Sequence, residues 1–538
     1  MELLKEEIDS GETHIVVNAL HQLPTIATVM GPQKVKSELI PYLSSNFHLG
    51  LFTEQDEVLF ALSQELGNLE QHSPGCAKDI LPLLEHLAGV DETVVREQAV
   101  NSIISVSKAL SESEVENLLA PSLLKLASAE NFSSRVSACS LVPCVFSRSA
   151  SERHKLWAKF LELSREETPM VRRAAVKQMG NLAKVMEKTA LVSELLPDLR
   201  QLAQDEQDQV RIICIETLVQ IAKIMTKEEN KLHTLPIIIV IGGDKSWRVR
   251  YHFADMFPEI IEAFGVEITE SSLIQTFSSL LKDVEADVKS AALISLKQIV
   301  SCFSPDKITN LIFPSVESIL SDTSLTVKTR KNAAGILGPL AKILGEGFTA
   351  SRIQPIFISI LQQEPNSEIK MNVLENLTSL AEVLGEGLVS EDLVESLFKL
   401  VEECPQWRVR EAITKVCGVI CKNFGGEVFS RLEKVLLHFL SDSVAQVRDS
   451  GVQTIASLSQ MFSSDWVNNE LLPKMQEMYS KDLSYLYRIT LIQSLGKLPV
   501  EPDQLVTVFS SAAKDSVPNV RLALCKVIKE RNQNSFDS

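Results

Sequence analysis

Aromatic residues are scarce in this chain. Phe, Trp and Tyr make up 6% of its 538 residues, whereas hydrophobic residues as a whole make up 45%. A core with so few rings must be packed mainly with aliphatic side chains, which suits helices rich in Leu, Ile, Val and Ala. Gly and Pro number only 21 each and charged residues reach 23%, so the composition is typical of a folded chain and not of a disordered one.

Positive charge is also in short supply. Lys and Arg number 53 against 70 Asp and Glu, which gives a formal net charge of −17. Such a chain is a poor general binder of phosphate backbones or of anionic lipid surfaces. We therefore predict no nucleic-acid partner and no membrane partner, and a protein partner that presents a basic patch.

Long apolar runs are missing. The most apolar stretch, "LPIIIVIGG" at 235–243, is far too short to span a bilayer, and the acidic start "MELLKEEIDSGE" does not resemble a secretory signal. The nine Cys are irregularly spaced in apolar contexts such as "SACSLVPC", which favours free thiols in a reducing compartment. We expect a cytoplasmic location, with the nucleus as a second one.

Motifs of catalysis and metal binding are absent as well. The sequence has no HExxH or other zinc spacing, no phosphate-binding loop with a lysine, and no GxSxG. Cys417 and Cys421 lie four residues apart and could share a metal, but no further ligand lies near them in sequence, so core packing is the better interpretation. We predict no catalytic residue, no metal and no cofactor, and hence a protein that is not an enzyme.

What the chain does contain is a repeat. "WRVR" occurs at 247–250 and again at 407–410. A Val followed by a cation recurs throughout, and one run of the cation has a constant spacing of 39 residues: Arg172, Arg211, Arg250, Lys289 and Lys328. The same position continues in both directions and gives fourteen units, marked also by Val16, Leu59, Arg96, Arg135, Lys370, Arg410, Arg448, Arg488 and Arg521.

Each unit has the pattern of two helices joined by a polar turn. In residues 193–229 the apolar positions recur every three to five residues on both sides of "QDEQDQ", as on one face of a helix. These positions are Leu195, Leu199, Leu202, Val210, Ile213, Leu218 and Ile221. Asp208 is placed to cap the second helix. A Pro recurs near the expected start of the first helix, as at Pro121 and Pro197, where its missing N–H is tolerated.

Two helices in about 39 residues, repeated fourteen times, are typical of HEAT repeats. The predicted fold is all-α, a superhelical solenoid of about fourteen helical hairpins spanning 1–538, in which each pair buries its apolar face against its neighbours. The recurrent Val is then a core residue. The recurrent cation is best interpreted as a ladder that reaches an acidic residue of the adjoining turn. The β-branched segment before Gly242 fits poorly, and we expect a short helix there with a loose carboxyl end.

Turns between the two helices of each unit would line up along the solenoid, where side chains are free of packing. Trp247 and Trp407 both fall in such turns. Each ring either folds onto its own surface beside a neighbouring Arg or serves as an interface anchor, because Trp and Arg dominate binding hot spots. The sequence leaves both interpretations open.

The turns also resemble a known family. "DEVLFALSQELG" (56–67), "VDETVVREQAV" (90–100), "TPMVRRAAVKQMG" (168–180), "DEQDQVR" (205–211), "DKSWRVRY" (244–251) and "WRVREAI" (407–413) are similar, in order and in register, to successive turns of the scaffolding, 65-kilodalton regulatory subunits of protein phosphatase 2A. The resemblance runs from about residue 35 to 525. It implies a non-catalytic scaffold that brings a serine/threonine phosphatase catalytic subunit together with a regulatory B-type subunit.

The resemblance also implies where each partner binds. The regulatory subunit would bind residues 1–310, whereas the catalytic subunit would bind residues 311–530. The implied regulatory-subunit residues are Asp91, Glu92, Pro169, Met170, Arg172, Arg173, Asp208, Trp247 and Arg248. The implied catalytic-subunit residues are Trp407, Arg408, Tyr485 and Asn519.

The chain departs from the family pattern at several turns. A Trp-Phe turn of the family is here Asn131-Phe132, a Lys before the second Trp-Arg is Gln406, and a turn Tyr is replaced at Ala445. Fourteen units stand where the family has fifteen, so contacts at the catalytic-subunit end would be missing or rearranged.

Other functions remain as alternatives. The chain could be an adaptor of another complex, either the related scaffold of protein phosphatase 4 or a nuclear-transport receptor, which would bind a small GTPase or basic localisation peptides. An enzyme is the third alternative, and activity of the purified chain without an added partner would revive it.

Overall fold

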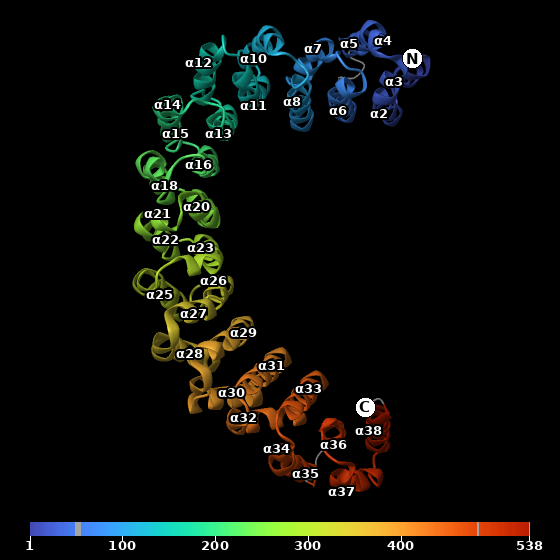
Figure 1. Cartoon of the computed structure of the whole chain (residues 1–538), viewed down its shortest axis with the longest axis vertical. Helices are drawn as coiled ribbons and strands as arrows, with labels where there is room; N and C mark the ends of the chain where they lie inside the picture. The colour runs from blue at the N-terminus through green and yellow to red at the C-terminus, as the bar shows by residue number, and fades with distance from the viewer. Residues whose placement is uncertain (49–54, 481–483, 537–538) are drawn as a thin grey trace. The chain divides into compact units, whose positions relative to one another are not determined.

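The computed structural model describes residues 1–48, 55–480 and 484–536, and every regular element in those ranges is a helix. The all-α prediction is confirmed. The chain divides into two compact units, Met1–Thr276 and Phe277–Ser538, and Figure 1 shows the helices of each unit following one another in chain order.

The first unit opens with three short helices and continues as helix pairs. Its elements are α1 (Glu2–Asp9), α2 (Thr13–His21), α3 (Leu23–Met30), α4 (Pro32–Lys34), η1 (Val35–Leu39), α5 (Ile40–His48), α6 (Asp56–His72), α7 (Ala77–Leu87), α8 (Thr93–Ser107), α9 (Glu112–Glu114), η2 (Val115–Leu119), α10 (Ala120–Ala127), α11 (Phe132–Arg148), α12 (Arg153–Ser164), α13 (Pro169–Ala183), α14 (Lys188–Ala190), η3 (Leu191–Leu195), α15 (Leu196–Leu202), α16 (Asp208–Ala222), α17 (Lys227–Glu229), η4 (Asn230–Thr234), α18 (Leu235–Gly242), α19 (Trp247–Asp255), α20 (Phe257–Phe264), α21 (Val266–Ile268) and η5 (Thr269–Leu273). The unit boundary falls inside α22 (Ile274–Leu281).

The second unit is built in the same way. Its elements are α23 (Ala286–Ile299), η6 (Val300–Cys302), α24 (Pro305–Lys307), η7 (Ile308–Ile312), α25 (Phe313–Ser321), α26 (Val327–Ala334), α27 (Leu337–Phe348), η8 (Thr349–Ile353), α28 (Gln354–Gln363), α29 (Ser367–Leu384), η9 (Gly385–Leu388), α30 (Glu391–Glu403), α31 (Trp407–Phe424), α32 (Gly426–His438), η10 (Phe439–Ser441), α33 (Ala445–Met461), α34 (Ser464–Trp466), η11 (Val467–Leu471), α35 (Leu472–Ser480), α36 (Tyr485–Lys497), α37 (Pro502–Ala513) and α38 (Pro518–Phe536).

Helices pack in pairs, and the pairs stack. We call the two members of a pair the A helix and the B helix, in chain order. In the first unit the B helices α6, α8, α11, α13, α16 and α19 each pack on the next, and A helices such as α7, α10 and α12 lie against their own B helices. The B helices α23, α26, α29, α31, α33, α36 and α38 form the matching row in the second unit. Each unit is therefore a stack of HEAT-type hairpins, as the repeat predicts.

The prolines of the A helices do not lie where the sequence suggested. Pro121 and Pro197 are second residues of α10 and α15, but each A helix begins earlier, with a short α-helical turn followed by a π-helical turn at Val115–Leu119 or Leu191–Leu195. A proline inside a helix lacks an N–H and crowds the carbonyl four residues back. The widened π turn just before it gives that carbonyl room, so these residues form one continuous A helix.

The apolar periodicity of the quoted repeat is confirmed at all but one position. Leu195, Leu199, Val210 and Leu218 are buried among neighbouring helices. Ile213 is only partly buried, and Cys214 takes the core position instead. A step of four residues, from Val210 to Cys214 to Leu218, keeps the core face aligned along α16 better than a step of three followed by five.

The β-branched segment before Gly242 is helical, as the repeat required. It forms α18, which is extended on its amino side by the π turn Asn230–Thr234 and ends at Gly242. A Cβ at Gly242 would lie 2.5 Å from Cγ2 of Thr276 and 2.9 Å from the Phe253 ring. Glycine is therefore needed because the A helix ends in close contact with the next A helix and with its own B helix, and packing outweighs the weak helix propensity of Ile and Val.

Candidate functional site

An arginine near the start of many B helices joins one hairpin to the next. Arg172 Nε and Nη2 donate to both carboxylate oxygens of Asp205 at 2.7 and 2.9 Å, and its Nη1 donates to the carbonyls of Glu166 and Glu167 at 2.7 and 2.8 Å. Arg211 contacts Asp244 in the same way, at 2.7 and 2.8 Å. One guanidinium thus donates hydrogen bonds both to its own turn and to the next turn. It can do so because a guanidinium is planar and has five N–H donors.

We call each such arginine–carboxylate pair a rung. The donor is the fourth residue of a B helix, and the acceptor is the third residue before the next B helix. The rungs are Arg135–Glu166, Arg172–Asp205 and Arg211–Asp244 in the first unit, and Arg330–Glu364, Arg410–Asp442 and Arg488–Asp515 in the second. The ladder interpretation of the recurrent cation is confirmed for these arginines.

One marker was placed wrongly. The sequence series assigned Lys328 to its ninth position, but Lys328 is only the second residue of α26 and is exposed. Arg330 is the fourth residue, is buried, and pairs with Glu364. The turn before α26 is longer than the turn before α23, and in it Asp322 accepts from the N–H of Ser324 well before the helix starts at Val327. A constant spacing of 39 residues therefore falls on Lys328 and not on Arg330.

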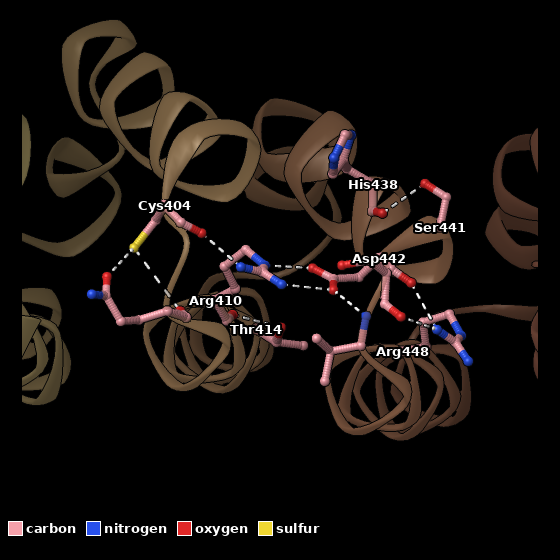
Figure 2. Close-up of polar contacts among 10 residues, drawn as sticks. Cys404, Arg410, Thr414, His438, Ser441, Asp442 and Arg448 are labelled. Carbon is pink, nitrogen blue, oxygen red and sulfur yellow. Dashed lines mark hydrogen bonds and ion pairs between the residues drawn. The ribbon is translucent and has the colours of Figure 1, made fainter.

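The acceptor carboxylates also hold the turns in shape. Figure 2 shows Arg410 reaching back to the Cys404 carbonyl at 2.6 Å and forward to Asp442 at 2.7 and 3.0 Å. Asp442 also accepts from the Val444 N–H at 2.8 Å. Burial alone would raise the pKa of Asp442, but the guanidinium and this N–H outweigh burial and hold the pKa below its ordinary value. The A–B turns are therefore rigid supports.

The predicted regulatory-subunit residues of the early turns lie on the surface of the first unit. Asp91 and Glu92 are exposed in the turn before α8, and Glu92 accepts from the Val94 N–H at 3.3 Å. Ser133 of the next turn donates to Asp91 at 3.4 Å, so consecutive turns are neighbours.

The turn before α13 presents two kinds of residue. Pro169 and Met170 open the helix, and Met170 is 52% exposed. Arg173 is exposed as well. Arg172, in contrast, spends its guanidinium on the rung to Asp205, and its side chain is 13% exposed. This geometry favours a structural role for Arg172 and leaves Met170 and Arg173 available to a partner.

Trp247 and Arg248 form a small platform with the preceding turn. The Arg248 guanidinium lies over the Trp247 ring, 5.0 Å from its centroid, and Nη1 is 3.8 Å from Asp208. Ser246 donates to Asp208 at 3.1 Å. Asp208 is the first residue of α16 and makes no capping hydrogen bond, so the capping role expected from the sequence is wrong; its carboxylate instead accepts from the next turn.

Trp407 and Arg408 repeat the stacked pair in the second unit. The Arg408 guanidinium lies 5.1 Å from the Trp407 ring centroid, Trp407 is partly buried and Arg408 is exposed. The first of the two interpretations, a ring beside its own Arg, thus describes both tryptophans, and a stacked cation–π pair still leaves a face that a partner can cover.

Tyr485 and Asn519 open later turns of the second unit. Tyr485 is the first residue of α36 and is 41% exposed, and Asn519 is the second residue of α38 and is exposed. Tyr485 has the same position in its helix as Trp407, and Asn519 lies one residue later in its helix.

Two exposed apolar residues were missed as candidates. Val94, the second residue of α8, is 57% exposed, and Phe132, the first residue of α11, is 44% exposed. Val94 has the same position in its helix as Met170, and Phe132 lies one residue earlier in its helix. The available signal was this register: an apolar residue one or two places into a B helix, before the buried third residue, faces outward in each case.

The two neighbouring cysteines of α31 serve as core residues. Cys417 and Cys421 are buried in α31, and burial raises the pKa of Cys421 to about 12 and that of Cys417 well above its ordinary value. Over residues 1–48, 55–480 and 484–536 no three His, Cys, Asp or Glu side chains are grouped so that they could hold a metal ion. In the same ranges, no helix has both the length and the hydropathy needed to cross a membrane.

Comparison with known proteins shows that the chain has relatives among curated proteins. It is 36% identical over 388 residues to the beta isoform of the human serine/threonine-protein phosphatase 2A 65 kDa regulatory subunit, a match that covers 71% of this chain and 63% of that protein. It is 42% identical over 284 residues to the "Protein phosphatase 2A scaffold subunit" of Dictyostelium discoideum, covering 52% and 48%. The chain therefore spans less than two thirds of the length of these relatives, and the resemblance seen in the turns is confirmed.

Two further comparisons concern the fold. The family model described as "Sister chromatid cohesion protein PDS5 protein" matches residues 53–260. A structure of Kap121p bound to Nup53p superposes with a TM-score of 0.59 at 16% identity, covering 97% of this chain and 54% of that one. A structure of Kap95p with RanGDP gives 0.51 at 12% identity, covering 100% and 75%. Identities this low show a shared helical-repeat architecture and nothing about partners.

Proposed function

We propose that this relative of the phosphatase 2A 65 kDa regulatory subunits is a non-catalytic scaffold. It would hold a serine/threonine phosphatase catalytic subunit on the A–B turns of residues 311–530 and a regulatory B-type subunit on the turns of residues 1–310. A cytoplasmic location, extending to the nucleus, accompanies this role. One observation carries the proposal: rows of exposed turn residues are mounted on a rung ladder that fixes the turns.

The ladder explains how such a surface can bind tightly. A partner that docks on mobile loops loses affinity to the entropy of ordering them. Here Arg410 and Arg211 tie each turn to its neighbour through buried ion pairs. The stacked Trp407–Arg408 and Trp247–Arg248 pairs are then presented by rigid backbone, and aromatic and arginine anchors of this kind carry much of the energy of protein interfaces.

The mechanism is one of proximity. A scaffold that binds two subunits turns their encounter into an intramolecular event and raises the effective concentration of substrate held by one at the active site of the other. No bond is made or broken on the scaffold itself. The net charge of −17 favours partners with basic surfaces and increases their rate of association.

The decisive experiment is a binding titration with Trp407→Ala. Removal of the ring should weaken binding of a purified phosphatase 2A-type catalytic subunit by about 2 kcal/mol and leave the helical circular dichroism unchanged. Trp247→Ala is the matched control, because its turn belongs to the regulatory-subunit row. Equal affinity of the two variants and the native chain for the catalytic subunit would refute the assignment of Trp407.

Affinity purification of the full chain tests the wider proposal. Recovery of a phosphatase 2A-type catalytic subunit together with a B-type subunit is the expected result. Recovery of a phosphatase 4-type catalytic subunit, or of a small GTPase with basic peptides, would replace it by one of the adaptor functions.

A further inference from the structure

In the second unit, a junction without a rung lies between α29 and α31. Between α29 and α31 the donor position, fourth in α29, is Lys370, and the acceptor position, three residues before α31, is Cys404. Both members differ from the arginine–carboxylate pairs before and after them, Arg330–Glu364 and Arg410–Asp442. The thiol occupies the place where the ladder elsewhere has a carboxylate.

A cavity of about 250 Å³ lies at this junction. Lys370 and Lys399 line it together with Glu403, Cys404 and Gln406. Neither lysine's ammonium group makes a hydrogen bond or an ion pair with any described residue. Two cations thus border the space in which the missing carboxylate would stand.

A second junction without a carboxylate shows that a cavity at a junction does not by itself leave a cation without a partner. In the first unit Ala129 occupies the acceptor position facing Arg96, and a cavity of about 270 Å³ is lined by Ala129. There the guanidinium is satisfied by its own turn, donating to the carbonyls of Val90 and Asp91 at 3.0 and 2.6 Å and to Thr93 at 3.3 Å. A lysine has no fork with which to do this, so the ammonium of the partly exposed Lys370 has no partner among the described residues.

Several of the remaining polar groups at the pocket are already bonded or exposed. Ser396 donates to the Asp392 carbonyl at 2.6 Å and accepts from Gln362 at 2.9 Å. The Cys404 thiol lies 3.5 Å from the Gln406 side-chain oxygen. Glu403 is exposed at the rim and is the one negative group in the lining, so it competes with an incoming anion.

We propose that this pocket binds a carboxylate from an acidic side chain of the protein that docks on the Trp407 turn. The chain itself identifies the ligand class, because six other junctions place a carboxylate at this position beside a cation. Gln406 lines the pocket and directly precedes Trp407, so an Asp or Glu that enters lies next to the aromatic anchor. The partner's identity rests on the proposed function; the pocket's preference for a carboxylate does not.

The first test needs no partner. The thermal midpoint of the full chain is measured in sodium succinate and in sodium chloride at equal ionic strength. Succinate should give additional stabilisation, since a ligand of the folded state raises the midpoint, and Lys370→Met should abolish it. Lys328→Met, which removes an exposed turn lysine of the same unit, should keep it. Equal midpoints in the two salts, or stabilisation by phosphate and not by succinate, would overturn the carboxylate assignment.

The second test uses the catalytic subunit. Cys404→Asp supplies the missing carboxylate from within, so it should raise the thermal midpoint and weaken partner binding by about tenfold, the loss expected for one charge-assisted contact. Lys370→Met should weaken binding similarly without stabilising the chain, and Glu403→Gln should strengthen it. Unchanged affinity in Cys404→Asp and Lys370→Met, with Trp407→Ala still impaired, refutes the pocket and leaves the scaffold proposal intact. If the native chain binds no catalytic subunit, the scaffold proposal fails and the succinate titration decides the pocket.

Discussion

The two "WRVR" turns share a sequence and differ in their surroundings. In both, an arginine lies on the tryptophan ring, at 5.0 Å for Arg248 and 5.1 Å for Arg408. The turn of Trp247 is bound to the preceding turn through Ser246 and Asp208. The turn of Trp407 has no such contact among the described residues and instead adjoins the cavity beside Cys404.

The difference shows that the WRVR motif does not determine how its turn is held by the neighbouring turn. The motif fixes the local geometry, because its first arginine lies on the ring and its second donates to a carbonyl of its own turn. The neighbouring turn decides whether the platform is closed, as at Asp208, or left open beside a pocket. Equal sequences at the surface can therefore present different binding chemistry.

The largest effect should come from the second arginine of the motif. Arg410→Met removes the partner of Asp442 and leaves a buried charge unpaired, which should cost about 3 kcal/mol. Hydrogen exchange of the α31 and α33 amides measures this locally, as is appropriate for a stack that need not unfold in one step. Arg408→Met, two residues away and exposed, should change exchange by less than about 0.5 kcal/mol. Similar losses in the two variants would contradict the division of roles within the motif.

The pH dependence should separate junctions with a rung from the junction between α29 and α31, which has none. The pKa of Asp442 is lowered in the folded chain, so its contribution is present above the unfolded pKa of about 3.9 and is lost as the pH falls through the lower folded value. Urea unfolding of Asp442→Asn should show a stability deficit at pH 7 that shrinks toward pH 3. Cys404→Asp should create a new acid-sensitive contribution of the same sign. A deficit independent of pH would count against an ionised Asp442.

The contact that closes the Trp247 platform should have a smaller effect. Ser246→Ala removes the hydrogen bond to Asp208 and should loosen residues 244–248 by about 1 kcal/mol, measured by hydrogen exchange. Gln406→Ala occupies the matching place before Trp407 and should not loosen its turn. Equal loosening of both turns would remove the distinction between them.

The smallest effect should come from the stacked arginines. Arg248→Met and Arg408→Met each remove a cation–π contact of about 0.5 kcal/mol at an exposed site. Acrylamide quenching of a chain that keeps one of its four tryptophans, either Trp247 or Trp407, should rise by a similar amount in each variant. A rise at only one tryptophan would show that the two pairs are not equivalent.

Most of the fold followed from periodicity, and the errors were local. Where a Val precedes the fourth residue of a B helix it is buried, as at Val171, Val210 and Val409, because a repeat of about 39 residues leaves few alternatives to stacked hairpins. Lys328 was chosen over Arg330 since a constant spacing cannot register a longer turn. The π turn before Pro121 was missed because it depends on how one A helix accommodates a ring, which no apolar pattern records.

The candidate site was less predictable than the fold. Turn residues such as Trp247, Met170 and Tyr485 were found because they resemble a family or depart from the polar composition of turns. Arg172 belonged to the same motif, and its commitment to Asp205 depends on a carboxylate 33 residues later in the chain. Val94 and Phe132 were missed because an exposed apolar side chain has no signature until the helix register is known.

The sequence by itself determined that this chain forms stacked helical pairs with an acidic surface, because apolar spacing and charge are properties of the chain alone. Only the tertiary structure decided which cations serve the ladder and which remain free. Arg410 and Lys370 hold equivalent positions in consecutive B helices, yet one is neutralised by Asp442 and the other borders an open pocket at Cys404. The reason is physical: a charge is satisfied or left available by what the neighbouring turn places within hydrogen-bonding distance of it.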